Sequence, residues 1–310
     1  DIILYHHCTE TELNYQVCQY TCKKIMIFHN ITPPHFFQNF SERDAISCQN
    51  GYEQTLFMRD KFDYCITDST FNKEILHSLG YDIPIKVSPI VKKYENDAVP
   101  DNNIIDLYSD KYINILFVGR LVPNKKIEDL LKIFCDYKKR NKKSRLLLVG
   151  NDIRMPSYVD VLKRYILDNQ LEDVIFTGKC SANALAAYYT VADVFLCLSE
   201  HEGFCVPLVE AMSFDIPVIA YDAAAIHGTL AESGVLIQNK EPSVVCDTIE
   251  TLITDPQYKN KVIESQRKRL RELSYKDTSK HFLQVLSEAV NYMGTAAKRL
   301  KKRTHIPKVL

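Results

Sequence analysis

The sequence carries no excess of either charge. Lysine plus arginine and aspartate plus glutamate both number 39, so the net charge at pH 7 is zero. A protein that binds DNA or RNA along its surface normally carries a basic excess. The balance therefore argues against a dedicated nucleic-acid binder, although it leaves room for a nucleotide in a local pocket.

Long apolar runs are also missing. No stretch reaches the roughly 18 consecutive apolar residues that a membrane-spanning helix needs. The chain begins at Asp1, within what reads as a strand and without an initiator methionine, as a fragment would. We expect a cytoplasmic protein that at most contacts the inner face of a membrane peripherally.

Two short patterns are absent as well. None of the ten cysteines forms a Cys-x-x-Cys pair, and several stand in apolar runs, as Cys197 does. We interpret them as small buried hydrophobic residues in a reducing compartment, not as disulfides or zinc ligands. No Gly-x-Gly-x-x-Gly follows a strand, which argues against a dinucleotide-dependent dehydrogenase.

The length of 310 residues predicts two domains. In the first third, short apolar runs alternate with helix-length segments, which is typical of a parallel sheet. The runs are 2–5, 24–28, 64–67 and 85–91, and the helical segments are 41–60 and 71–79. The polar, turn-rich segment 92–111 then reads as a linker between the domains.

A second alternating series follows the linker. Its strands are predicted at 113–118, 145–149, 174–176, 193–198, 217–221 and 234–237, with helices between them. Several of these strands end at glycine and pass into a helix, as in a doubly wound sheet, where ligands bind at the carboxyl ends of the strands. We place domain boundaries at 1–111 and 112–275, followed by a terminal helix and basic tail at 276–310.

The most informative segment runs from Ser199 to Ala211, where a strand gives way to a helix. The helix start offers unpaired backbone N–H groups and a positive dipole end, which suit an anion. Gly203 lets the backbone approach a ligand closely. Glu202 and Glu210 add two carboxylates, which accept hydrogen bonds from hydroxyl groups. This combination suits a phosphate flanked by a sugar and a ribose.

Cations follow the first strand of the second series. Gly119 ends that strand, and Arg120 and Lys125 come directly after it. Arginine grips phosphate oxygens in a fork, while lysine acts as a compact charge. Taken singly, each feature has a simpler explanation: a solvated loop for the cations, and a solvent-exposed loop glutamate with a helix glutamate that complements the dipole.

Taken together, and in this order, the motifs resemble the donor domain of family 4 of the glycosyltransferases. The resemblance covers residues 112–290 and rests on segments 119–125, 176–178, 192–194, 202–210 and 217–220. It implies the α/β GT-B fold: two Rossmann-like, doubly wound parallel-sheet domains facing a cleft, acceptor-side first and donor-binding second. It also implies a retaining, metal-independent hexosyltransferase with no cofactor beyond a UDP- or GDP-linked sugar donor.

The resemblance assigns roles to single residues. It places the donor sugar on Glu202, the ribose on Glu210 and the diphosphate on Arg120 and Lys125. The remaining donor-binding residues are Gly119, Gly178, Lys179, Gly203, Phe204, Cys205 and Val206. Same-face attack is implied, with the leaving phosphate accepting the proton of the acceptor. The catalytic set is completed by His29, because segment 25–30 resembles the family's strand that ends in an active-site histidine; a core or edge histidine is the alternative. The following segment 31–37 resembles a subgroup of bacterial surface-polysaccharide transferases.

The N-terminal domain is expected to be incomplete, because the first strands and a glycine-rich loop of full family members have no counterpart here. A partner chain that completes the domain, and a nucleotide-sugar-binding subunit dependent on that chain, therefore remain open. A GT-B epimerase or phosphorylase is a further alternative. The acceptor is expected to be a saccharide or lipid-linked, and the basic tail, with the cationic segment 267–271, is a candidate contact for anionic lipid.

Overall fold

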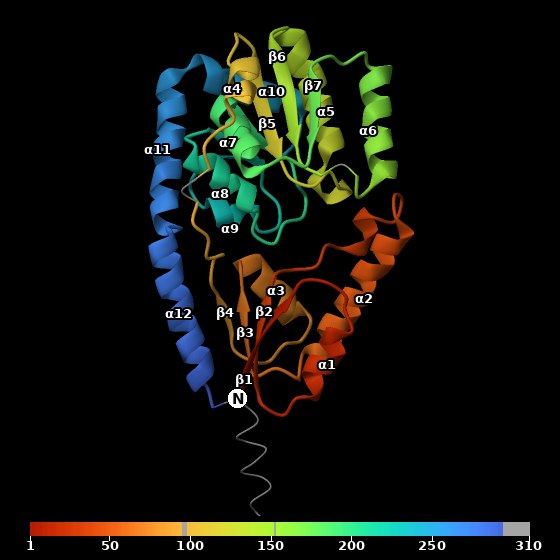
Figure 1. The fold of residues 1–310 in the computed structure, drawn as a ribbon, viewed down its shortest axis with the longest axis vertical. Coiled ribbons are helices and arrows are strands. Elements are labelled where there is room, and N and C mark those ends of the chain that lie inside the picture. Colours follow the sequence, from red (N-terminus) through yellow and green to blue (C-terminus); the bar gives the residue numbers. More distant parts are fainter. Residues whose placement is uncertain (95–97, 152, 294–310) are drawn as a thin grey trace, which may run out of the picture.

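Four parallel strands form the N-terminal sheet in the computed structural model, which describes residues 1–94, 98–151 and 153–293 (Figure 1). Their order across the sheet is the order of the chain: β1 (Ile2–His7), β2 (Lys23–Phe28), β3 (Tyr64–Thr67) and β4 (Ile85–Val87). The connecting helices are α1 (Leu13–Gln19), the short η1 (Pro34–Phe36), α2 (Glu42–Met58) and α3 (Thr70–Ser78).

Strand β2 shows why this sheet is covered on both faces. Successive side chains of a strand point to opposite faces. Met26 and Phe28 belong to one apolar cluster, whereas Ile25 and Ile27 belong to another, and all four are buried. A run of apolar residues without polar alternation is thus explained by packing on both sides.

The C-terminal sheet has six strands in the order β10-β9-β8-β5-β6-β7, all parallel. The strands are β5 (Ile113–Val118), β6 (Ser144–Val149), β7 (Val174–Gly178), β8 (Val194–Cys197), β9 (Val218–Tyr221) and β10 (Val235–Ile237). The helices of this part are η2 (Pro123–Lys125), α5 (Ile127–Arg140), α6 (Pro156–Asp168), α7 (Ala182–Val191), α8 (Val206–Ser213), α9 (Ile226–Leu230), α10 (Pro242–Thr254) and α11 (Pro256–Glu272). The expected α/β class with doubly wound parallel sheets is confirmed.

The segment expected to be a linker contains a helix, α4 (Asn102–Tyr108). Asp101, which reads as part of a turn in the sequence, caps this helix through a hydrogen bond from the amide of Asn103. Ile104 and Tyr108 pack against the apolar cluster of the C-terminal domain. The helix is therefore held by tertiary packing that a local sequence pattern does not reveal.

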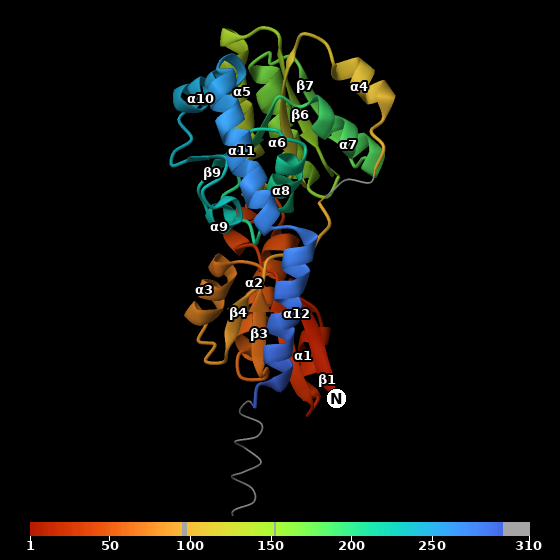
Figure 2. The same ribbon diagram turned by 90° about the vertical axis from the view of Figure 1, so that its left-hand side faces the viewer.

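The chain crosses between the domains a second time near its end. Helix α11 packs on the C-terminal domain, and α12 (Tyr275–Asn291) continues along the N-terminal sheet (Figures 1 and 2). Val285 and Ala289 of α12 form one apolar cluster with the β2 and β3 side chains of the N-terminal sheet. The last helix of the chain thus covers one face of its first sheet.

The region between η1 and α2 also joins the two domains. Phe37 and Ala45 belong to the apolar core of the C-terminal domain. The Ser157 hydroxyl donates a hydrogen bond of 2.6 Å to the Phe40 carbonyl, and the rings of Phe40 and Tyr158 meet edge to face. These contacts bring the carboxyl ends of the two sheets face to face.

Nothing in the described part of the chain is a helix with the length and hydropathy of a membrane span. The basic tail considered for lipid contact lies outside the described residues. In the cationic segment of α11, Arg267 pairs with Asp215 and Glu264, and Arg269 donates to the carbonyls of Gly228 and Thr229. These two arginines therefore stabilise the fold of the C-terminal domain.

Candidate active site in the interdomain cleft

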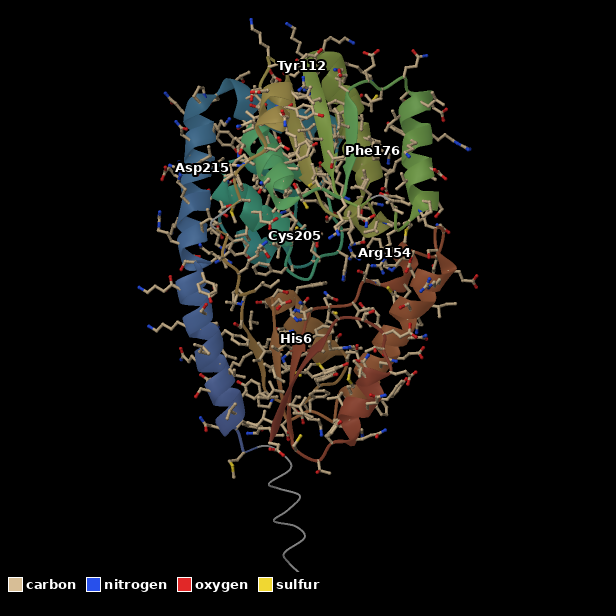
Figure 3. The ribbon with its side chains drawn as sticks, viewed as in Figure 1. His6, Tyr112, Arg154, Phe176, Cys205 and Asp215 are labelled. Atoms are coloured by element: carbon tan, nitrogen blue, oxygen red, sulfur yellow. The ribbon has the colours of Figure 1, made fainter. Side chains whose placement is uncertain are left out.

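A cavity of about 560 Å³ lies between the domains, at the carboxyl ends of both sheets. The four residues expected to be catalytic, His29, Arg120, Lys125 and Glu202, all line it. The rest of the lining consists of Cys8, Thr9, Asn30, Ile31, Thr32, Phe37, Asp44, Ser47 and Cys48 from the N-terminal domain, and Val122, Asn124, Arg154, Met155, His201 and Gly203 from the C-terminal domain. Figure 3 shows His6 and Cys205 on opposite sides of this region, with Arg154 at its flank.

Lys125 and Glu202 form the central ion pair of the cavity. Lys125 ends the short helix η2, and its Nζ lies 2.5 Å from Oε1 of Glu202. The side chains are only 16% and 9% exposed. Burial alone would lower the pKa of Lys125, but the Glu202 carboxylate outweighs it and the pKa is raised. The ammonium group is therefore charged and ready to meet an anion in the cavity.

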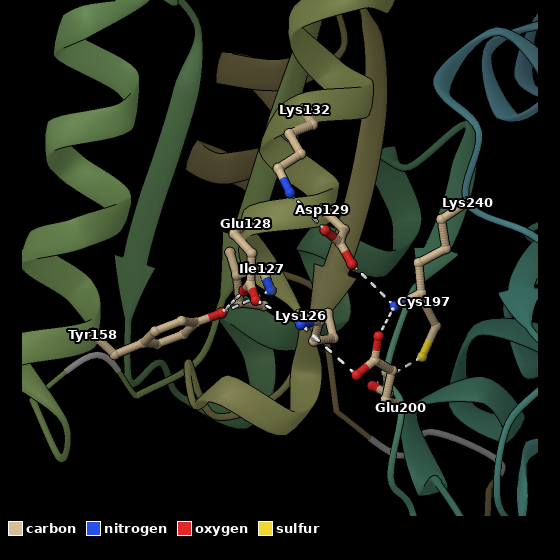
Figure 4. A network of polar contacts seen from close by, with 10 residues as sticks. Lys126, Ile127, Glu128, Asp129, Lys132, Tyr158, Cys197, Glu200 and Lys240 are labelled. Carbon is tan, nitrogen blue, oxygen red and sulfur yellow. Dashed lines mark hydrogen bonds and ion pairs between the residues drawn. The ribbon is translucent and has the colours of Figure 1, made fainter. Parts of the chain in front are cut away.

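Surrounding contacts fix the loop that carries Glu202. The Glu200 amide donates to the Asn124 carbonyl, and the Asn124 side chain donates to the His201 carbonyl, both at 2.9 Å. The Glu200 carboxylate pairs with Lys126 and Lys240 (Figure 4). The strand-to-helix loop is thus tied to the segment that carries Lys125, so that both charges are positioned together.

The start of α8 has the backbone shape expected of an anion site. Cys205 is its N-cap, and the residue has φ 69°, in the left-handed region. For a residue other than glycine this conformation costs roughly 1–2 kcal/mol. The Thr229 hydroxyl donates to the Phe204 carbonyl and holds the turn in place. Pro207 has no N–H and the Leu208 amide donates to the Cys205 carbonyl. The Val206 amide, at the positive end of the helix dipole, is therefore the group of the first turn that is available to a ligand.

Gly203 lines the cavity and also meets the backbone of the N-terminal domain. The sequence suggested that a ligand approaches its backbone. In the structure a Cβ at this position would lie 2.6 Å from the His29 carbonyl oxygen and 3.2 Å from Cβ of Asn30. The close neighbour is therefore the backbone of the N-terminal domain, and the glycine allows the two domains to meet.

His29 sits in a chain of three hydrogen-bonded side chains. Its Nδ1 lies 2.7 Å from Oδ2 of Asp68, and its Nε2 lies 2.7 Å from Nδ1 of His6. An ionised carboxylate only accepts, so Nδ1 of His29 carries a proton, and in the neutral imidazole Nε2 is then an acceptor. His6 therefore donates to His29. The side chain expected to meet a sugar hydroxyl is already engaged, by a histidine that the sequence did not single out.

Glu210 faces a separate cavity of about 220 Å³. It accepts a 3.0 Å hydrogen bond from the Tyr189 hydroxyl and pairs with Lys92 of the linker. Tyr94 and Phe214 also line this smaller cavity. The two glutamates of the motif thus line two different cavities.

Several other residues predicted to bind the donor lie outside both cavities. Gly178, at φ 64°, ends β7, and its carbonyl accepts from the Gly150 amide. Neither Gly178 nor Lys179 lines either cavity, and the same holds for Gly119, whose Cα faces the ring of Phe117. Their predicted contacts with the donor stay predictions.

His201 is a cavity residue to which sequence reasoning gave no role. It is 7% exposed, lies between the rings of Phe36 and Phe71, and its Nε2 has no hydrogen-bond partner in the structure. The only signal in the sequence was its place between Glu200 and Glu202. Its position marks it as a polar group that a bound hydroxyl would satisfy.

Burial lowers the pKa of both His201 and His7 to about 4. Both are neutral in the folded state at pH 6, while the unfolded chain takes up protons near pH 6.5. The free energy of unfolding is therefore expected to fall as the pH drops from 6.5 towards 4, by about 3 kcal/mol for each group. Urea unfolding at pH 7 and pH 4.5 measures this loss.

Replacing His201 by phenylalanine should shrink the difference between the two pH values by about 2–3 kcal/mol. The exposed residue His77, changed in the same way, is the control. If His201→Phe showed the same difference as the wild type, the pKa of His201 would have to be equal in the folded and unfolded states.

Comparison with known proteins identifies a family for this chain. Residues 102–269 match the model of a family described as glycosyl transferases group 1. The GDP-mannose-dependent alpha-mannosyltransferase of Mycolicibacterium smegmatis is 35% identical over 123 residues, which are 39% of this chain and 29% of that protein. The alpha-monoglucosyldiacylglycerol synthase of Streptococcus pneumoniae is 25% identical over 232 residues, 70% of this chain and 51% of that protein.

Among solved structures, HepE of Anabaena in complex with UDP-glucose superposes with a TM-score of 0.72. It is 20% identical, and the match covers 86% of this chain and 72% of that one. This likeness supports the GT-B fold. The chain spans about half the length, or less, of the curated relatives it matches.

Proposed function

The chain belongs to the group 1 family of glycosyl transferases, and on that premise we propose that it moves a hexose from a UDP- or GDP-linked donor to a saccharide or lipid-linked acceptor. The configuration at the sugar is retained, and no metal takes part. The observation that carries the proposal is the convergence of Arg120, Lys125 and Glu202 on one cavity between two domains, beside Gly203 of the loop that leads into α8.

The chemistry of the site follows from its charges. Departure of a nucleoside diphosphate builds negative charge on its phosphates. Arg120, Lys125 and the N-terminus of α8 stabilise this charge, a task that a divalent cation performs in other enzymes. Glu202 has one oxygen on Lys125 and accepts from a hydroxyl of the donor sugar with the other. The leaving phosphate takes the proton of the acceptor hydroxyl.

The smaller cavity completes the donor site. Glu210 and the aromatic side chains of Tyr94, Tyr189 and Phe214 offer a carboxylate beside flat apolar surfaces. Such a surface suits a ribose and a base. In this arrangement the ribose hydroxyls replace Tyr189 and Lys92 as partners of Glu210.

Binding of a nucleotide tests the donor site. The similar proteins differ in the nucleotide: one is named for GDP-mannose, and the solved structure holds UDP-glucose. A ligand at 100 times its dissociation constant stabilises the folded state by about 2.7 kcal/mol, which corresponds to several degrees in melting temperature. We expect one of the UDP and GDP series to raise the melting temperature.

Arg120→Ala should abolish this rise, whereas Arg140→Ala, which removes a surface partner of Asp247, should keep it. The absence of any rise with UDP, GDP and their hexose conjugates would overturn the donor site. A rise that survives Arg120→Ala would place the nucleotide elsewhere.

The His6–His29 contact gives a second prediction. A donor hydroxyl that binds Nε2 of His29 must displace His6. Removing His6 should therefore lower the donor KM by about two- to tenfold, the worth of one competing hydrogen bond, with kcat unchanged. Steady-state kinetics of His6→Ala checks this. Asp68→Asn, which releases the other side of His29, should raise the KM instead; an equal effect in both variants would contradict the displacement.

An open sheet edge favours a second candidate function. In the described structure β1 has a neighbour on one side only, and Ile2 and Leu4 are 47% and 41% exposed. An exposed strand edge is a template for a further strand. The alternative is therefore a nucleotide-sugar-binding subunit whose activity needs a strand from another chain. Turnover by this chain alone would exclude it.

A further inference from the structure

Two thiols and a carboxylate meet inside the loop that begins α8. Cys197 ends β8, Cys205 begins α8, and Glu202 lies between them in the chain. One ligand atom from each of the three lies within 4.8 Å of the others, and all three residues are buried. Glu202 also lines the large cavity, so the cluster has a path to solvent.

We propose that Cys197, Glu202 and Cys205 form a binding site for a thiophilic divalent cation of the Zn²⁺ type. Thiolates and carboxylates are common ligands of zinc, and a three-ligand site keeps a fourth position open. A tetrahedral zinc with Zn–S bonds of about 2.3 Å holds two sulfurs roughly 3.8 Å apart. The present spacing therefore needs an adjustment of about 1 Å at most, which side-chain rotation supplies.

The backbone at Cys205 gives an independent reason to assign a role to its thiol. Its φ of 69° is a conformation that glycine adopts freely and other residues adopt only with strain. Strained backbone persists where the side chain or the turn has a function. The anion-binding turn alone would be served as well or better by glycine. The cysteine side chain packs in the apolar cluster of the C-terminal domain, and its sulfur lies close to Cys197 and Glu202.

The charge of the cluster also suits a cation. Lys125 and Glu202 together are neutral, and both thiols are neutral when protonated. A divalent ion that replaces the two thiol protons leaves the sum unchanged. Burial of an uncompensated charge is costly, so this exchange avoids the main penalty for placing an ion beside a lysine. Two exchangeable protons and one fixed carboxylate therefore match one divalent cation.

The bound ion would act on the donor site, and this step rests on the proposed function. It would hold Glu202, the residue assigned to the donor sugar, and pull on Cys205 at the start of the phosphate-binding helix. Zinc is therefore a reversible inhibitor of donor binding here, and the transfer reaction itself remains independent of metal.

Cadmium is the probe for the test, because thiolate-to-cadmium charge transfer gives an ultraviolet band that does not depend on activity. The reduced, metal-free full chain is titrated with Cd²⁺. One equivalent should produce the band. Cys197→Ala and Cys205→Gly should lose it, and Glu202→Gln should weaken Cd²⁺ affinity by about 10- to 100-fold. Cys135→Ser, a half-buried thiol of α5, should leave the first equivalent unchanged.

The Cys205→Gly variant should fold, because glycine suits the left-handed backbone at this position. Loss of its band would therefore report the loss of a ligand and not the loss of the fold. Retention of the band in Cys205→Gly, or the absence of a band from the reduced wild-type chain with one equivalent of Cd²⁺, would overturn the site. In a second arm, Zn²⁺ should suppress the melting-temperature rise given by UDP or GDP. Nucleotide binding without a cadmium band would refute the metal site alone, and a band without nucleotide binding would refute the proposed function alone.

Discussion

Lys125→Met is expected to reduce kcat/KM by about 100- to 1000-fold, the usual loss when one preorganised group that stabilises transition-state charge is removed. Lys125 is held 2.5 Å from Glu202 in the wall of the cavity, and its pKa is raised, so its charge is present throughout the pH range of activity. The kinetic measurement uses the nucleotide sugar identified by the melting-temperature screen.

The same substitution should destabilise the fold. It leaves the Glu202 carboxylate 9% exposed and without its partner. Breaking a buried pair from one side costs about 3–5 kcal/mol, whereas replacing both partners by apolar residues is often close to neutral. We therefore expect Lys125→Met with Glu202→Leu to regain most of the stability in urea unfolding and none of the activity.

Lys126→Met is the matched control for Lys125→Met. Lys126 is the next residue, pairs with Glu128 and Glu200, and is more exposed, at 24%. Its contribution to stability should be about 1 kcal/mol or less, with kcat/KM within a few-fold of the wild type. If Lys125→Met behaved like Lys126→Met, the assignment of the phosphate charge to Lys125 would be wrong.

Gly203→Ala is expected to lower kcat/KM by about 100-fold through a single methyl group. The added Cβ would lie 2.6 Å from the His29 carbonyl oxygen, a backbone atom that has no rotamer with which to yield. The domains must then separate or the loop of Glu202 must shift. A misplacement of about 1 Å in an active site can cost this factor.

Gly228→Ala provides the control for Gly203→Ala. Gly228 lies in α9 of the same domain, and a Cβ there would meet no atom within 4 Å. It should retain full activity. Small-angle scattering of the two variants should show a larger radius of gyration for Gly203→Ala only. Normal kinetics in Gly203→Ala would mean that the closed arrangement of the domains is not required.

The sequence predicted the elements whose patterns are local. The helix expected between Ser199 and Ala211 is observed as α8 (Val206–Ser213), because a buried strand precedes it and its own apolar face is buried. Helix α4 was missed, since its stability comes from packing against the C-terminal domain. Helix α1 was missed for a similar reason: Val17 alone of its apolar residues is buried, beneath the N-terminal sheet.

Part of the site followed from two motifs that each come after a strand of one parallel sheet, since the carboxyl ends of such strands meet at one edge. Glu202 and Lys125 were named together, and the structure places them in contact. Contacts that depend on the meeting of the two domains were not predictable. The approach of Gly203 to the His29 backbone is such a contact. The bond from His6 to His29 lies within the N-terminal domain, and the separation of Glu202 and Glu210 into two cavities lies within the C-terminal domain; both depend on side-chain packing that no motif encodes. No short pattern in one segment encodes the position of another domain.

The last helix has a consequence for the order in which the chain folds. The β2 and β3 side chains that contact Val285 and Ala289 are made about 200 residues before α12. At 5–20 residues per second, the ribosome needs roughly 10–40 s to supply that cover. During this interval one face of the N-terminal sheet is open to water and to other nascent chains. Chaperones that hold apolar surface would therefore act on the first domain, and its folding would finish only after the second domain has emerged.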